Sequence, residues 1–148
     1  MAGRLRTRLE QLGFRLREPV GNFALLGLIR EAPFALPSAY LDLLRATNGG
    51  AGSVRGLPVP GLGAIYLTPA EQVLSEHRGW GVDEHAPDQL LFATDGEGRF
   101  YLFDDSPAGR VRICRSAEVP NPASWQVACE SFDELVAALG APPEPEAP

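Results

Sequence analysis

Three apolar segments follow one another in the second half of the chain, at residues 90–93, 100–103 and 111–114. Clusters of Asp, Gly, Ser and Pro separate them, and apolar runs bounded by such turn residues are typical of β-strands. Successive strands joined in this way form an antiparallel meander. The sequence therefore predicts a meander over residues 90–114, and residues 125–129 are a candidate for a further strand.

The first connection of this meander, Asp95-Gly96-Glu97-Gly98, allows two interpretations. Its acidic residues could hold a metal ion, or its glycines could form a tight turn. A calcium loop supplies oxygen ligands at alternate positions and ends in a bidentate Glu, whereas here Arg99 and an apolar run follow Glu97. Glycine accepts the positive φ angles that hairpin turns need. We therefore predict a hairpin turn without a bound metal.

Helical patterns precede and follow the predicted sheet. Asn22 is a candidate cap for a helix, Pro69 can open another, and Ser131 with Glu134 forms a capping box before a last helix that Gly140 ends. Helices are expected at residues 5–12, 22–30, 37–47, 69–77 and 132–139. The first of them is amphipathic and should cover an edge of the core. A chain of 148 residues with this pattern fits one α+β domain.

The net charge of −6 is unevenly placed along the chain. Residues 1–55 carry eight Arg and four acidic residues, whereas residues 56–148 carry five Arg and fifteen acidic residues. An acidic chain lacks the basic face that general nucleic-acid binding requires. Its longest apolar run, FALLGLI, is too short to span a bilayer, so we expect no membrane partner. Cys114 and Cys129 lie in strand-like surroundings and are expected to be buried and reduced, as in a soluble cytoplasmic protein.

Other residue groups give weaker chemical patterns. His77 and His85 flank a loop with acidic residues, but neither lies in the spacing of a zinc motif, so both are expected to be solvent-exposed. The glycine-rich stretch 49–56 follows a helix and lacks the lysine of a phosphate loop. Asp104 and Asp105 are adjacent on a strand and should point to opposite faces, which makes no catalytic dyad. We expect no enzyme activity, cofactor or metal.

Four segments, taken in order, resemble the SUKH superfamily: LPSAYLDLLRATNGG, AIYL, FATDGEGRFYLFD and ESFDELVAAL. This superfamily includes fungal cell-wall assembly regulators of the Smi/Knr type and many bacterial toxin-immunity proteins. In it a Leu-Pro helix ends in Asn-Gly-Gly, a glycine-containing acidic turn joins two strands, and a Ser-Phe-acidic helix closes the domain. The matching residues are Leu36, Pro37, Tyr40, Asn48, Gly49, Gly50, Asp95, Gly96, Gly98, Phe103, Asp104, Ser131 and Phe132.

The resemblance covers about residues 22–140 and implies an α+β domain of the SUKH type, with a mostly antiparallel sheet between N-terminal helices and a C-terminal helix. It also implies protein binding without catalysis. We accordingly assign residues 1–21 to an N-terminal amphipathic helix and linker, and residues 22–140 to the SUKH-like domain. Residues 141–148 alternate proline with acid and are expected to form a disordered tail.

The resemblance and the charge together favour an immunity protein that neutralises a bacterial toxin with a basic domain. Many such toxins act on nucleic acid through a basic cleft, which an acidic surface attracts by electrostatic steering. Trp80 lies between two glycines in a polar loop, where exposure would make it a contact residue. The candidate partner-binding residues are Tyr66, Trp80, Asp83, Glu84, Asp88, Asp95, Glu97, Asp104 and Asp105.

Two alternatives stay open. The fungal relatives suggest a regulatory scaffold, in which the proline-acidic tail could be a docking segment. A small enzyme is the third hypothesis, and carboxylates that converge with His77 or His85 in a pocket would favour it.

Overall fold

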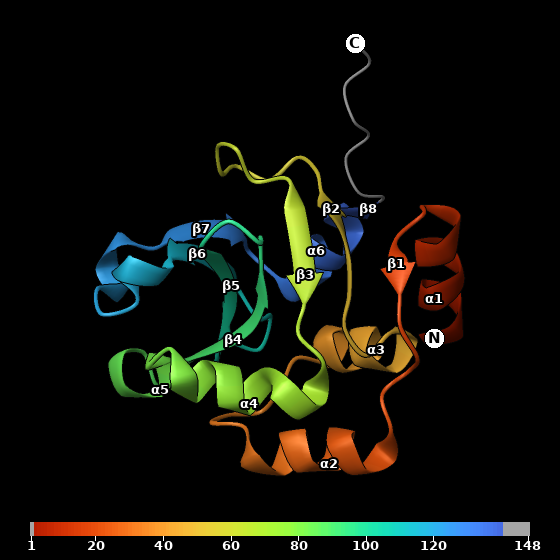
Figure 1. The fold of residues 1–148 in the computed structure, drawn as a ribbon, viewed down its shortest axis with the longest axis horizontal. Coiled ribbons are helices and arrows are strands. Elements are labelled where there is room, and N and C mark those ends of the chain that lie inside the picture. The colour runs from red at the N-terminus through yellow and green to blue at the C-terminus, as the bar shows by residue number, and fades with distance from the viewer. Residues whose placement is uncertain (1, 141–148) are drawn as a thin grey trace.

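The computed structural model describes residues 2–140 (Figure 1). In it, helices pack around a curved β-sheet. The strands are β1 (Arg15–Leu16), β2 (Gly50–Val54), β3 (Ala64–Leu67), β4 (Gln89–Thr94), β5 (Arg99–Asp104), β6 (Val111–Arg115), β7 (Gln126–Cys129) and β8 (Leu139–Gly140). The helices are α1 (Ala2–Gln11), α2 (Asn22–Glu31), α3 (Ser38–Ala46), α4 (Ala70–Gly79), α5 (Val82–His85) and α6 (Phe132–Ala138). The strands pair antiparallel in the order β1 to β7, and β8 pairs with β2. The predicted single α+β domain is confirmed.

The predicted meander consists of β4, β5 and β6, and β7 extends it. Leu91 pairs with Leu102, and Tyr101 pairs with Ile113. The register shifts between Leu91 and Ala93, which marks a bulge in β4. This bulge lies just beyond the last residue pair of β3 with β4, where α4 packs on the strand instead. A bulge re-aims the side chains of a strand, so β4 can serve two different neighbours.

Both faces of the meander are buried, which explains why its strands are continuous apolar runs. On one face Phe92 and Phe103 pack against Tyr40 of α3 and Phe132 of α6, and the ring centroids of Tyr40 and Phe103 are 4.9 Å apart. A second cluster on the other face lies against α5 and two 3₁₀ turns, η1 (Ser116–Glu118) and η2 (Pro122–Ser124). Its members are Val82, Ala86, Leu91, Phe100, Leu102, Cys114, Val119 and Trp125.

The N-terminal segment packs into the same fold. α1 contacts α3, and β1 pairs with β2. Leu9 of α1 is buried in the main core, as expected for an amphipathic helix that covers a core edge, and Phe14, which follows the helix, is buried there too. The ring of Phe14 lies so close to Gly52 that a Cβ there would come within 2.3 Å of it. Glycine is therefore required in β2 at this crossing.

The helix ends differ in part from the sequence prediction. Gly21, not Asn22, occupies the N-cap of α2, and no side chain caps this helix. Ser131 caps α6 as predicted, since its Oγ accepts from the N–H of Glu134 at 3.2 Å. The other half of the predicted capping box differs, because Oε2 of Glu134 accepts from the N–H of Glu130 at 3.1 Å, one residue before the N-cap. α6 ends before Leu139, because residues 139–140 continue as β8 and pair with β2. Part of the predicted loop before β4 forms α5. The predicted tail lies outside the described residues.

Candidate functional site

Asp95 organises the turn between β4 and β5. Its Oδ1 accepts from the main-chain N–H groups of Glu97 (2.8 Å) and Arg99 (2.9 Å), and its Oδ2 accepts from Nε of Arg99 (2.7 Å). Gly96 and Gly98 adopt φ angles of 77° and 90°, in the left-handed region that favours glycine. The acidic-glycine stretch is therefore the predicted hairpin turn, held by a buried carboxylate.

The charge of Asp95 is balanced inside the protein. Burial alone would raise the pKa of this carboxyl, but the hydrogen bonds from Arg99 and Glu97 lower it below its ordinary value. Arg99 in turn donates to the carbonyl oxygens of Pro60 (2.9 Å) and Gly61 (2.7 Å). One ion pair therefore ties the hairpin to the connection between β2 and β3.

Asp104, the last residue of β5, has a similar structural role. It is buried, and its Oδ1 accepts from the main-chain N–H groups of Ser106 and Arg110, each at 3.1 Å. Asp95 and Asp104 thus use their oxygens inside turns. The sequence analysis places both among the partner-facing acids, but both side chains are buried and therefore do not belong to an exposed surface. An acidic side chain near a loop can instead accept hydrogen bonds from the backbone of that loop.

The other five acidic residues of the predicted surface are exposed: Asp83, Glu84, Asp88, Glu97 and Asp105. Asp83 and Glu84 belong to α5, which leads directly into β4. The main-chain N–H of Asp105 donates to the carbonyl of Asp88 at 3.0 Å, so these two acids lie together at the open end of the hairpin. Glu97 lies in the turn at the opposite end.

The two predicted aromatic anchors line one groove beside the hairpin. Tyr66 of β3 and Trp80 after α4 are 49% and 48% exposed. They line a groove of about 340 Å³ together with Leu91, Thr94 and Phe100 of the hairpin. The rings of Trp80 and Phe100 pack with their centroids 4.9 Å apart. The groove therefore has an apolar floor and two half-exposed aromatic walls.

Tyr66 is positioned by the glycine of the turn. A Cβ on Gly96 would come within 2.8 Å of Cε2 of Tyr66, so the ring lies directly against the backbone of the turn. At the other end, Gly81 has a φ of 75° and turns the chain from Trp80 into α5. Tyr66 thus lies beside the turn that carries Glu97, and Trp80 directly precedes the helix that carries Asp83 and Glu84.

Two further groove residues were not predicted from the sequence. Gln72 and Glu76 of α4 line the groove on the same side as Trp80. These three residues recur every fourth position, which places them on one face of a helix. That spacing is visible in the sequence, but the glycines on both sides of Trp80 favour a loop there.

His77 lies on the buried side of α4, which corrects the prediction that it is exposed. It is 2% exposed, and its Nδ1 accepts from the N–H of Leu91 at 3.2 Å. β3 ends before this point, so the imidazole takes the place of a strand partner for β4. Burial lowers the pKa of His77, an effect that Asp83 partly offsets. Neutral His77 therefore supports the strand that forms the groove floor, whereas His85 is exposed.

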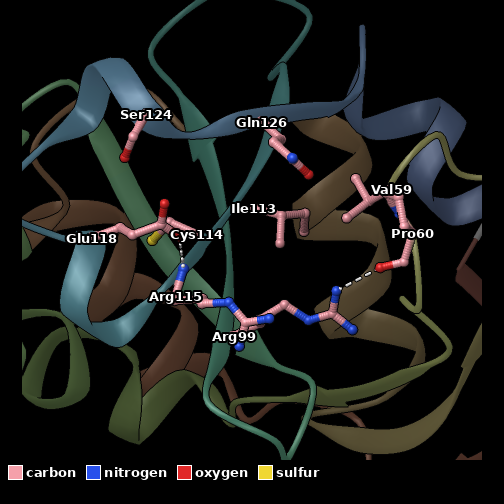
Figure 2. Close-up of a pocket in the computed structure, with 9 residues that line it drawn as sticks. All are labelled: Val59, Pro60, Arg99, Ile113, Cys114, Arg115, Glu118, Ser124 and Gln126. Carbon is pink, nitrogen blue, oxygen red and sulfur yellow. Dashed lines mark hydrogen bonds between the residues drawn. The ribbon is translucent and has the colours of Figure 1, made fainter.

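A second cavity, of about 290 Å³, lies over β5, β6 and β7 (Figure 2). Arg99 crosses it to reach Pro60, and the main-chain N–H of Arg115 donates to Oε1 of Glu118 at 2.7 Å. Cys114 also lines it, and burial raises the pKa of this thiol to about 12. A protonated thiol is a poor nucleophile. The hydrogen bonds of Arg99 and Glu118 tie the segments around this cavity together.

The remaining chemical expectations concern cysteines, metals and membranes. Cys114 and Cys129 are buried and free, and burial also raises the pKa of Cys129, to about 11. Within residues 2–140, no group of three or more His, Cys, Asp or Glu side chains is arranged to hold a metal ion. No helix in this part of the chain is long and apolar enough to cross a membrane.

Comparison with known proteins agrees with the fold and with the resemblance of the four segments. No curated protein matches the chain. The model of the SMI1/KNR4 family (SUKH-1) matches residues 25–138, from α2 to the end of α6. This match covers most of the chain and all elements that form the groove, and the chain therefore belongs to the SMI1/KNR4 family.

Proposed function

We propose that this protein is a non-catalytic, cytoplasmic binding domain whose partner is a basic protein, and that it acts as an immunity protein for a bacterial toxin. The observation that carries the proposal is the groove, where Tyr66 and Trp80 stand half-exposed beside Glu76. Tyr and Trp are the residues most often found at the energetic centre of protein interfaces.

The charges around the groove favour a basic partner. Glu97 lies next to the Tyr66 end, and Asp83 and Glu84 follow the Trp80 end. An arginine of the partner can stack on the indole of Trp80 while its guanidinium pairs with Glu76. The acids at both ends speed the encounter by electrostatic steering, which salt weakens.

Family membership also supports a second function, that of a regulatory scaffold, because the SMI1/KNR4 model matches residues 25–138. The two functions differ in what binding accomplishes. An immunity protein must suppress the toxicity of its partner, whereas a scaffold must not. A toxin gene beside the gene for this chain favours immunity.

The decisive experiment tests binding and protection with the same variants. The full chain and a Tyr66→Ser/Trp80→Ala variant are used to capture proteins from the native organism, and each captured basic protein is expressed with either form. We expect the wild type to bind one basic toxin and restore growth, and the double variant to lose both. Leu12→Ser, which changes an exposed leucine just after α1, is the matched control.

Two results would contradict the proposal. Capture of the same partner by the wild type and the double variant would exclude the groove as the binding site. Binding that is lost in the double variant but gives no protection from toxicity would favour the scaffold.

A further inference from the structure

The outward face of α2 is apolar and exposed. Phe23 is 97% exposed, Leu26 is 59% exposed and Ile29 is 41% exposed. The opposite side of the same helix buries Leu25 and Leu28 in the core. A helix that is apolar on both sides normally has neighbours on both sides. The fold covers only one side of α2, and Phe23 makes almost no contact that would keep it from water.

A hollow lies beside this protruding phenylalanine. α2 and α4 run side by side (Figure 1), and the surface between them is hollowed by about 320 Å³. Gly27, one helical turn after Phe23, lines this hollow, and a Cβ built on it meets no heavy atom within 4 Å. The protruding side chain of Phe23 and an empty notch, the hollow at Gly27, therefore lie next to each other on one face.

The charges on this face are balanced and separated along its length. Glu71 lies in the first turn of α4, and Arg78 lies in its last turn. On α2, Arg30 and Glu31 lie at the end of the helix. Both helices run in the same direction in Figure 1, so one end of the face carries an acid and the other carries two arginines and one glutamate. The face as a whole is neutral, although the chain is acidic.

We propose that the face formed by Phe23, Leu26, Gly27 and Ile29 is a two-fold interface with a second copy of this chain. The two α2 helices cross antiparallel, and Phe23 of each copy packs on Leu26 and over Gly27 of the other. The same rotation brings the acidic end of one face to the basic end of the other. A two-fold axis requires a self-complementary surface of this kind.

A second copy fits this face better than a basic toxin does. The neutral charge offers no attraction to a basic protein, whereas two acidic chains repel each other least where their surfaces are neutral. Antiparallel helices also place opposite ends of their dipoles together. The dimer leaves the aromatic groove, on the other side of α4, to another partner.

Sedimentation velocity and light scattering of the full chain, from about 1 µM to about 200 µM, test the proposal. We expect the wild type to shift from the mass of one chain to that of two. Phe23→Ser should raise the dissociation constant at least about 100-fold. Burial of one phenylalanine lowers the dissociation constant about tenfold or more, and the two-fold dimer buries two of them.

A second variant fills the notch without harming the monomer. Gly27→Gln has room in the single chain and replaces a poor helix former with a good one, so the variant should fold at least as well as the wild type. It should nevertheless block Phe23 of the second copy and also give monomers. Leu12→Ser and Trp80→Ala should leave the dimer intact.

The proposal is overturned if the wild type stays monomeric over the whole range, or if its dimer survives both Phe23→Ser and Gly27→Gln. Loss of the dimer in Trp80→Ala would assign self-association to the groove instead. Assemblies that grow beyond two chains with concentration would exclude a closed two-fold contact.

Discussion

The groove of Tyr66 and Trp80 and the outward face of α2 are both exposed apolar surfaces, but they are built differently. The groove takes residues from β3, α4, β4 and β5, and a buried ion pair, a left-handed glycine and a neutral histidine hold these elements in place. The apolar residues of the α2 face belong to one helix, and the most exposed of them, Phe23, touches almost nothing.

The difference separates two kinds of recognition. The groove combines amphipathic Tyr and Trp rings with acids, which suits a partner of opposite charge. The α2 face combines Phe, Leu and Ile with balanced charges, which suits a copy of itself. It follows that damage to the supports of the groove should change both stability and binding, whereas changes to the α2 face should leave the fold as it is.

The largest effect is expected from Asp95→Ala. This change leaves the guanidinium of Arg99 without its carboxylate in a mostly buried place, where the side chain of Arg99 is only 14% exposed. Loss of one partner of a buried ion pair costs about 3 kcal/mol in the free energy of unfolding. Urea denaturation monitored by tryptophan fluorescence measures this cost.

Asp105→Ala is the matched control, because this carboxylate is exposed in the same sequence region. Its substitution should change the free energy of unfolding by less than about 0.5 kcal/mol. Equal effects of the two substitutions would mean that the turn does not depend on its buried acid, and the contrast between the two surfaces would lose its main support.

A smaller effect on stability is expected from Gly96→Ala and Gly98→Ala, and these two variants should differ in their effect on Tyr66. Both glycines have positive φ, so each substitution should cost about 1 to 2 kcal/mol in stability. Only the Cβ at position 96 meets the ring of Tyr66, since a Cβ on Gly98 meets nothing within 4 Å. Gly96→Ala alone should shift the ring resonances of Tyr66 in NMR spectra and weaken partner binding. Identical spectra for the two variants would show that the turn does not position this anchor.

The pH dependence of stability should report on His77. The pKa of this imidazole is lowered below 6.5 in the folded protein, so the unfolded chain takes up a proton at a higher pH than the folded chain does. The free energy of unfolding therefore falls as the pH falls from 6.5 towards the folded pKa, by up to about 1.4 kcal/mol per pH unit. The contribution of Asp95, whose pKa is lowered below 3.8, is lost only in more acidic solution.

The variant His77→Asn separates the pH range in which His77 titrates from the more acidic range in which Asp95 titrates. The Oδ1 of asparagine can accept from the N–H of Leu91 in place of Nδ1, and it does not titrate. Denaturation curves at pH 7.5 and pH 5.5 should then coincide more closely than those of the wild type, while the loss below about pH 4 remains. An unchanged slope between pH 6.5 and 5.5 would mean that titration of His77 does not cause this pH dependence.

The parts of the fold that depend on neighbouring residues were predictable from the sequence. The hairpin at Asp95 follows from glycines beside an acid, and the cap at Ser131 follows from a four-residue pattern. Both are local rules, and the structure confirms both. The α+β class followed from the order of such segments.

The groove was only partly predictable, because it depends on pairing between distant elements. Tyr66 and Trp80 were chosen as anchors, but nothing in the sequence indicates that β3 and the end of α4 bring them together over Phe100. The burial of His77 likewise depends on the bulge in β4 and on the point where β3 ends. The buried side of α2 was also not predictable from the sequence. Its pattern predicts a helix, but apolar residues occur on all sides of that helix and do not indicate which side is buried.

The smallest expected effect is that of Phe23→Ser on the stability of the single chain. A side chain that is 97% exposed loses almost no contact when it is removed, so the free energy of unfolding at dilute concentration should change by less than about 0.5 kcal/mol. Trp80→Ala removes the packing on Phe100 and should cost about 1 to 2 kcal/mol. If Phe23→Ser destabilised a dilute monomer as much as Trp80→Ala does, Phe23 would have a structural role inside one chain. If its effect instead appeared only as the concentration rises, the stability it provides would come from a second chain, because binding to the folded state alone makes apparent stability depend on concentration.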